Sequence, residues 1–297
     1  MIGFLKQVAP LIFYLTFVLV ALISLTGKVQ YGLYFLVPLL PLQNVVEKIH
    51  YYPFGKDFND ILILGMFFGW FISKASKREK LVQPSLYNYI FPLYLIFTYM
   101  TLWAGSRFLR VDLPLSPADP RVQLWKNYML LPTLFFITFN NLKDVKQFKI
   151  LFGCMCASMF LMNYYNVAQV RYMTSWISRT KVTGTFMWLG ANEVAAFYAT
   201  YTFVLLGVFL FFTFKNEIKE KIGLGILILM NFFIVLFMFS RAAYLASFMA
   251  MGVVAIMKKR ILIIPMLVCV LCWQFVLPER VVQRIEFSEQ DGELDDS

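Results

Sequence analysis

The chain has 297 residues, of which 60% are hydrophobic, 18% are aromatic and only 15% are charged, and its formal net charge is +10. A soluble domain carries about 25% charged and 45 to 50% apolar residues, so this composition excludes a soluble globular protein, a secreted disulfide scaffold and a disordered chain. Long apolar runs recur along almost the whole sequence, unlike the short alternating strands of a membrane β-barrel. The sequence therefore predicts an all-α fold, namely a polytopic helical membrane protein embedded in a lipid bilayer.

Ten segments are apolar enough to be candidate membrane helices, since a helix needs about 20 such residues to cross the hydrocarbon core. Proline interrupts the second of them, at Pro38 and Pro41, and proline removes a helical hydrogen bond. We therefore expect about nine or ten transmembrane helices, and whether the second segment crosses fully stays open. In chain order the segments are 8–26, 31–46, 60–73, 87–104, 124–140, 148–167, 190–214, 222–239, 242–257 and 261–277.

Clusters of positive charge indicate the orientation, because lysine and arginine in short loops stay on the cytoplasmic side. An even number of predicted spans separates each consecutive pair of clusters, which places all four clusters in the cytoplasm and the loops 47–59, 105–123 and 168–189, with the tail from Pro278, outside. The orientation of the N-terminus stays open. The four clusters are Lys74–Lys80, Lys143–Lys149, Lys215–Lys221 and Lys258–Arg260.

The segment 222–257 must turn near its middle. As one helix it would be about 54 Å long, whereas the hydrocarbon core is about 30 Å thick, and lysines flank it at both ends. The midpoint is Ser240-Arg241. We therefore expect a break at these residues, with Arg241 at or near the outer surface.

The predicted outer face carries mostly arginine, whereas the cytoplasmic clusters are mostly lysine. Arginine grips phosphate through two parallel hydrogen bonds, so this face favours a phosphate-bearing partner. In the alternative interpretation the arginines pair with nearby acids or anchor at lipid phosphates. The arginines are Arg107, Arg110, Arg121, Arg171, Arg179, Arg241, Arg280 and Arg284, and the nearby acids are Asp112, Asp119, Glu279 and Glu286.

Two charges, Glu193 and Arg241, interrupt otherwise apolar sequence. An ionised side chain at the bilayer centre costs about 2.5 to 3.5 kcal/mol on insertion scales, so each is a functional candidate, although a purely structural ion pair is also open. The sequence holds no phosphate-binding loop, no serine-hydrolase elbow and no zinc motif. We expect no cofactor and no metal, and the charge of +10 reflects membrane topology instead of nucleic-acid binding.

Two motifs after residue 178 resemble those of a known family. The segment R-T-K-V-T-G-T-F-M-W-L-G-A-N-E-V-A-A-F begins at Arg179, and F-S-R-A-A-Y-L-A follows about fifty residues later. Together they resemble the O-antigen ligase and O-antigen polymerase superfamily, and P-E-R-V-V-Q-R-I resembles the opening of that family's periplasmic loop. The matching residues are Gly184, Thr185, Phe186, Asn192, Glu193, Ala195, Ala196, Ser240, Arg241, Ala242 and Ala246, with 278–285 for the third motif.

The resemblance implies a multi-pass enzyme of the bacterial inner membrane whose site faces the periplasm. Such an enzyme transfers a glycan from an undecaprenyl-diphosphate carrier to a lipid A-core or to another glycan, as in lipopolysaccharide and polysaccharide biosynthesis. Ligase and polymerase stay open, and so does a transporter or flippase of a lipid-linked or anionic solute. The implied organisation is an N-terminal membrane bundle at 1–178, a ligase-like core at 179–277 and the start of a periplasmic loop at 278–297.

We expect Arg241 to be the catalytic residue, because a fixed guanidinium would stabilise the charge that develops on a lipid diphosphate leaving group. The candidate substrate-binding residues are Arg179, Lys181, Asn192, Glu193, Arg280 and Arg284. Members of the family continue into a longer loop and closing helices, whereas this sequence stops at Ser297 in an acidic run. The resemblance therefore predicts that part of the acceptor side is missing, and no general base is assigned.

Overall fold

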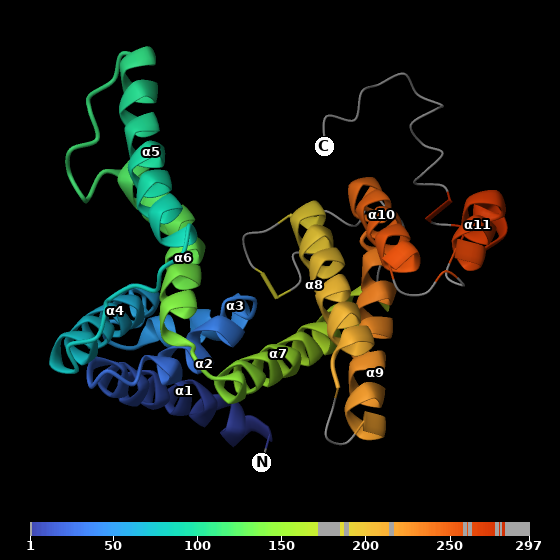
Figure 1. The fold of residues 1–297 in the computed structure, drawn as a ribbon, viewed down its shortest axis with the longest axis horizontal. Helices are drawn as coiled ribbons and strands as arrows, with labels where there is room; N and C mark the ends of the chain where they lie inside the picture. Colours follow the sequence, from blue (N-terminus) through green and yellow to red (C-terminus); the bar gives the residue numbers. More distant parts are fainter. Residues whose placement is uncertain are drawn as a thin grey trace. The chain divides into compact units, whose positions relative to one another are not determined.

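The computed structural model is built of helices, and Figure 1 shows them in chain order. It describes residues 2–171, 185–186, 190–213, 217–257, 260, 263–276, 279 and 281–282, and no strand occurs among them. The helices are α1 Ile2–Leu25, α2 Val29–Leu39, α3 Gln43–Val46, the 3₁₀ helix η1 Glu47–Tyr51, α4 Phe58–Ser76, α5 Tyr87–Phe108, α6 Pro120–Asn141, α7 Val145–Arg171, α8 Ala191–Phe211, α9 Glu217–Phe237, α10 Arg241–Met257, α11 Ile263–Leu271 and α12 Trp273–Val276.

Each of the ten predicted segments is helical over most of its described residues, which confirms the all-α fold of a multi-pass membrane protein. Five described helices are long and apolar enough to cross a bilayer, or six if the bent pair around residue 41 is one span. This number is lower than the nine or ten expected. The helices α5 and α6 have 22 residues each, but α5 is rich in tyrosine and α6 carries arginine, glutamine, lysine and asparagine. The helix α10 has only 17 residues.

The predicted interruption is confirmed around Pro41, whereas Pro38 lies inside α2 and does not end that helix. The helix α2 ends at Leu39, and the axis of the following α3–η1 segment is bent from it by 108°. Proline restrains the residue before it and lacks an amide hydrogen, so the chain cannot continue as one straight helix through this point.

The chain divides into two compact units, each described here by itself. The first comprises Met1–Leu40 with Val45–Cys154, and the second comprises Pro41–Asn44 with Met155–Ser297. The domain boundaries expected from the family resemblance, after residues 178 and 277, fall outside the described residues and stay a prediction.

In the first unit, α1, α2 and α4 pack against one another through small residues. A Cβ atom on Gly69 of α4 would lie 1.8 Å from the Ser24 carbonyl oxygen of α1, and one on Gly32 of α2 would lie 2.6 Å from Met66. Gly69 therefore sets how closely the backbones of α1 and α4 approach, and Gly32 leaves room for side chains of the neighbouring helices. Phe58, Trp70 and neighbouring side chains are fully buried beside these crossings.

The helices α5 and α6 form an antiparallel pair in the first unit (Figure 1), and side chains fix the loop between them. Asp119 caps α6 by accepting a hydrogen bond from the Arg121 amide at 2.9 Å, while the Arg121 guanidinium donates to Asp119 and to Ser106. These bonds hold the pKa of Asp119 below its ordinary value. The loop has no regular secondary structure, and Arg121 forms the ion pair that the alternative interpretation expected.

Two of the lysine clusters meet in the first unit, because Glu79 joins them. The Glu79 carboxylate accepts hydrogen bonds from Lys74 Nζ at 2.5 Å and from Lys143 Nζ at 3.1 Å. These bonds lower the pKa of Glu79 from 4.5 to about 2. The bridge therefore connects the segment after α4 with the segment before α7.

This bridge predicts a pH-dependent stability difference between the wild type and Glu79→Gln. Since the pKa of Glu79 is depressed in the folded protein, its contribution is complete above pH 4.5 and is lost as the pH falls toward about 2. The variant should be slightly less stable at neutral pH, with a small difference because the pair is exposed. Thermal unfolding of both proteins across this range checks the prediction, and a difference that stays constant with pH would contradict it.

In the second unit, α8 and α9 form a helical hairpin, and α10 packs against α8 (Figure 1). The turn predicted within 222–257 is confirmed at the expected residues. The helix α9 ends at Phe237, α10 begins at Arg241, and Phe239 between them has a φ of 53°. Positive φ is unusual for a side chain of this size, and it reverses the chain direction within three residues.

Candidate functional site

Arg241 is the first residue of α10 and is half-buried. The carbonyl of Ser240, which is buried, accepts a hydrogen bond from the Tyr244 amide at 3.1 Å, so Ser240 occupies the N-cap position that serine favours. The Tyr244 hydroxyl donates to the Leu236 carbonyl across the break. The S-R motif is therefore a helix start whose positive dipole end adds to the charge of Arg241.

Asn192 and Glu193 lie in the first turn of α8, which packs against α10. Gly190 is the N-cap, and its carbonyl accepts a hydrogen bond from the Val194 amide at 3.0 Å. The Glu193 carboxylate folds back over this cap, since a Cβ on Gly190 would lie 2.5 Å from Glu193 Oε2. A carboxylate at this position is stabilised by the helix dipole, so Glu193 has a structural role in addition to the substrate-binding role predicted for it.

Two residues of the G-T-F motif, Thr185 and Phe186, lie within the described residues, and hydrogen bonds join Thr185 to α3 and to the residues just before it. The Thr185 hydroxyl donates to the Pro41 carbonyl at 2.7 Å, and the Asn44 amide donates to the Thr185 carbonyl at 3.3 Å. The Phe186 ring packs edge-on against Phe197 of α8, with ring centroids 5.0 Å apart. Thr185 and Phe186 are both buried, so these two residues are part of the packing of the second unit.

The remaining predicted site residues cannot be placed. Arg179, Lys181, Arg280 and Arg284 lie outside the described residues. Of the predicted site residues, the structure thus places Asn192, Glu193 and Arg241 in the first turns of two helices that pack against each other. The substrate-binding role of the other four stays a prediction. Within the described ranges, no group of three histidine, cysteine, aspartate or glutamate side chains could hold a metal ion.

A buried amide cluster in the second unit was not predicted. Asn163 Nδ2 of α7 donates to Asn231 Oδ1 of α9 at 2.8 Å, and Asn166 Nδ2 donates to the Tyr198 hydroxyl of α8 at 2.6 Å. All four side chains are fully buried. Asn163, Asn166 and Gln169 follow one another at intervals of three along α7 and each carries a side-chain oxygen without a hydrogen-bond partner.

The spacing of these amides is the signal that sequence reasoning missed. Residues three apart share a helix face, and polar side chains within membrane helices mark helix contacts or functional cavities. Because the amides are uncharged, they do not interrupt the apolar runs as Glu193 and Arg241 do. The cluster connects α7 with both members of the α8–α9 hairpin.

Comparison with known proteins gives no relative. No family model, no curated protein and no solved structure matches the chain.

Proposed function

We propose that the Arg241 end of α10 binds the diphosphate of a lipid-linked glycan. The chain would then transfer the glycan from an undecaprenyl-diphosphate carrier to a lipid A-core or glycan acceptor at the periplasmic face of the bacterial inner membrane. The single observation that carries the proposal is the position of Arg241, half-buried at the start of a helix directly after the chain reversal.

The chemistry follows from where charge develops. An acceptor hydroxyl attacks the anomeric carbon of the glycan and loses its proton to solvent water. The bond from that carbon to the carrier oxygen breaks, and the lipid diphosphate leaves with the bonding electrons. A guanidinium already in place stabilises the departing charge without reorganisation, and the helix N-terminus offers amide donors and a positive dipole to the same anion. Asn192 and Glu193, in the first turn of the neighbouring helix, would form the glycan side of this site.

A transporter or flippase is the second candidate, and one observation favours it. The α2 and α3–η1 pair is bent by 108°, and discontinuous helices of this kind form the binding sites of many transporters. The two candidates share the anion-binding role of Arg241 but differ in outcome. A transferase changes the carrier-linked glycan chemically, whereas a flippase moves it unchanged between leaflets.

Binding of undecaprenyl diphosphate to the purified full chain in nanodiscs tests the role of Arg241. Arg241→Lys keeps the charge but loses the two-pronged contact, and a charged hydrogen bond contributes about 1.5 to 3 kcal/mol. We therefore expect the dissociation constant to rise about 10-fold to 100-fold. The matched control is Arg260→Lys, an exposed residue beyond the other end of α10, which should bind like the wild type.

Two further results would decide between the candidates. Glycan transfer in cells that contain the variant at the wild-type level should fall with binding if the chain is a transferase. Carrier movement across vesicles with no change in the glycan would instead support the flippase. Unchanged diphosphate binding by Arg241→Lys would refute both roles for this residue.

A further inference from the structure

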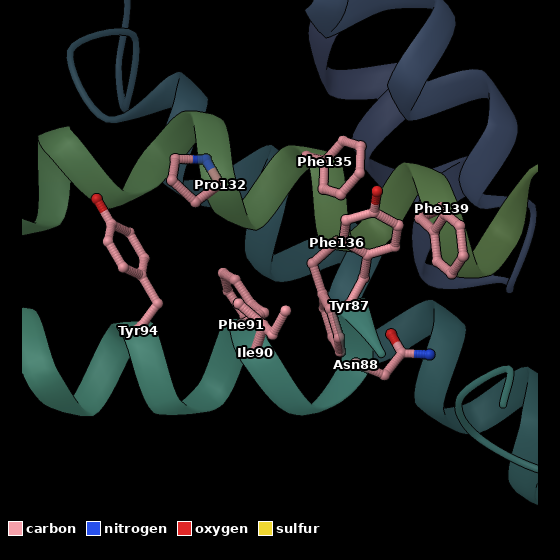
Figure 2. Close-up of a pocket in the computed structure, with 9 residues that line it drawn as sticks. All are labelled: Tyr87, Asn88, Ile90, Phe91, Tyr94, Pro132, Phe135, Phe136 and Phe139. Atoms are coloured by element: carbon pink, nitrogen blue, oxygen red, sulfur yellow. The ribbon is translucent and has the colours of Figure 1, made fainter. Parts of the chain in front are cut away.

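An apolar groove of about 140 Å³ lies between α5 and α6 in the first unit (Figure 2). The rings of Phe91 and Phe136 stack across it at 4.6 Å between centroids, and Tyr87 packs edge-on against Phe135 and Phe139. The lining consists of one face of each helix, with a single amide at one end. The lining residues are Tyr87, Asn88, Ile90, Phe91, Tyr94, Pro132, Phe135, Phe136 and Phe139.

The groove occupies one end of the helix pair. Its residues on α5 span 87–94, the first two turns of that helix, and its residues on α6 span 132–139, within about the last three turns. This corresponds to about 10 Å along the axes. The groove is open at its side, since 47% of Ile90 and 55% of Phe135 are exposed, so an extended apolar chain could enter from the surrounding lipid.

Hydrogen bonds close the end of the groove where α5 begins. Asn140 Nδ2 donates to Asn88 Oδ1 at 2.8 Å, and the backbone N–H of Gln83 donates to Asn140 Oδ1 at 2.9 Å. Asn88 Nδ2 donates to the Gln83 carbonyl. These bonds hold the segment before α5 against the end of α6, and they separate the apolar groove from the polar segments beyond it.

Those polar segments form a surface that we call the basic surface. It carries seven cations against the two acids Glu79 and Asp144, a formal charge of +5. Lys80 precedes Gln83 by three residues and Lys143 follows Asn140 by three, so the surface begins at the closed end of the groove. The Glu79 bridge holds its two halves together. The basic surface consists of Lys74, Lys77, Arg78, Lys80, Lys143, Lys146 and Lys149.

We propose that the groove and the basic surface form one binding site for an acidic glycerophospholipid. One acyl chain lies in the aromatic groove, and the phosphate headgroup lies among the lysines. Lysine is a solvated point charge that suits headgroup phosphate, and an aromatic groove offers acyl chains apolar contact without a partner for polar groups. A soluble anion would use only the basic surface, whereas a neutral lipid would use only the groove.

The experiment compares phosphatidylglycerol with phosphatidylcholine of identical acyl chains, bound to the purified full chain in mild detergent and counted by native mass spectrometry. The wild type should bind phosphatidylglycerol more tightly. The triple variant Lys77→Gln, Lys80→Gln and Lys146→Gln keeps the Glu79 bridge and should lose about fivefold in phosphatidylglycerol affinity per charge removed. Its affinity for phosphatidylcholine should not change.

The groove is tested with a matched pair of substitutions on α5. Ile90→Trp fills the groove and should weaken the binding of both lipids, whereas Leu93→Trp, exposed and outside the lining, should leave both unchanged. Two results would contradict the role of the headgroup: equal binding of both lipids by the wild type, or a preference for phosphatidylglycerol that the triple variant keeps. Either result would overturn the proposal that the basic surface binds the lipid headgroup. If Ile90→Trp bound phosphatidylglycerol as tightly as the wild type, or if inorganic phosphate displaced the lipid, the lipid would be held only by charge at the basic surface. Either result would overturn the proposal that the groove is part of a lipid site.

Discussion

Replacing Gly69 by alanine is expected to disrupt the packing of α1 against α4. The added Cβ would lie 1.8 Å from the Ser24 carbonyl oxygen and 3.2 Å from the Gly27 amide nitrogen. Both are backbone atoms, and a rotamer change cannot move them. Overpacking a tight contact costs about 1 to 3 kcal/mol and occasionally more, so we expect a loss of about 3 kcal/mol or more in the free energy of unfolding.

The matched control is Gly65→Ala, one turn earlier on the same helix. Its Cβ would lie 3.6 Å from the Ala21 carbonyl oxygen, which is an ordinary contact, and alanine favours a helix over glycine by about 1 kcal/mol. Thermal unfolding of the purified variants in one detergent should show Gly69→Ala far below the wild type and Gly65→Ala close to it or above it. Similar midpoints for the two variants would contradict the close approach of α1 and α4.

The second large effect is expected at the buried amide pair of Asn163 and Asn231. Replacing either by leucine leaves the other amide buried without its partner, and an unmet buried polar group costs about 1 to 3 kcal/mol. Replacing both removes the unmet groups together. The double variant should therefore be more stable than the sum of the single losses predicts, with a coupling energy of up to about 1.7 kcal/mol, as observed between membrane helices.

A double-mutant cycle of unfolding free energies measures this coupling. The control cycle uses Tyr164 and Leu229, which lie on α7 and α9 with 73% and 71% of their surfaces exposed. Replacing these two by alanine should give additive effects. Additive losses at Asn163 and Asn231 would mean that the hydrogen bond between them contributes nothing to the packing of α7 on α9.

Part of the candidate site follows from sequence because charge and length limit the possibilities. Ser240-Arg241 had to lie at a break, since one helix over 222–257 would exceed the bilayer thickness, and the structure places the break there. The placement of Asn192 and Glu193 at a helix start agrees with the predicted segment 190–214. The substrate, by contrast, depends on side chains brought together from several helices, and composition does not encode these contacts.

The sequence by itself determined the class of this protein, the positions of its helices, the break around Pro41 and the reversal before Arg241. Each of these depends on local chemistry, namely apolar length, proline geometry and the cost of charge in lipid. Only the tertiary structure decided that Glu79 bridges two lysine clusters, that Arg121 is held by Asp119, and that buried amides join α7 to the α8–α9 hairpin. Most of these contacts join residues far apart in the chain, and their partners are selected by helix packing, which local sequence patterns do not specify.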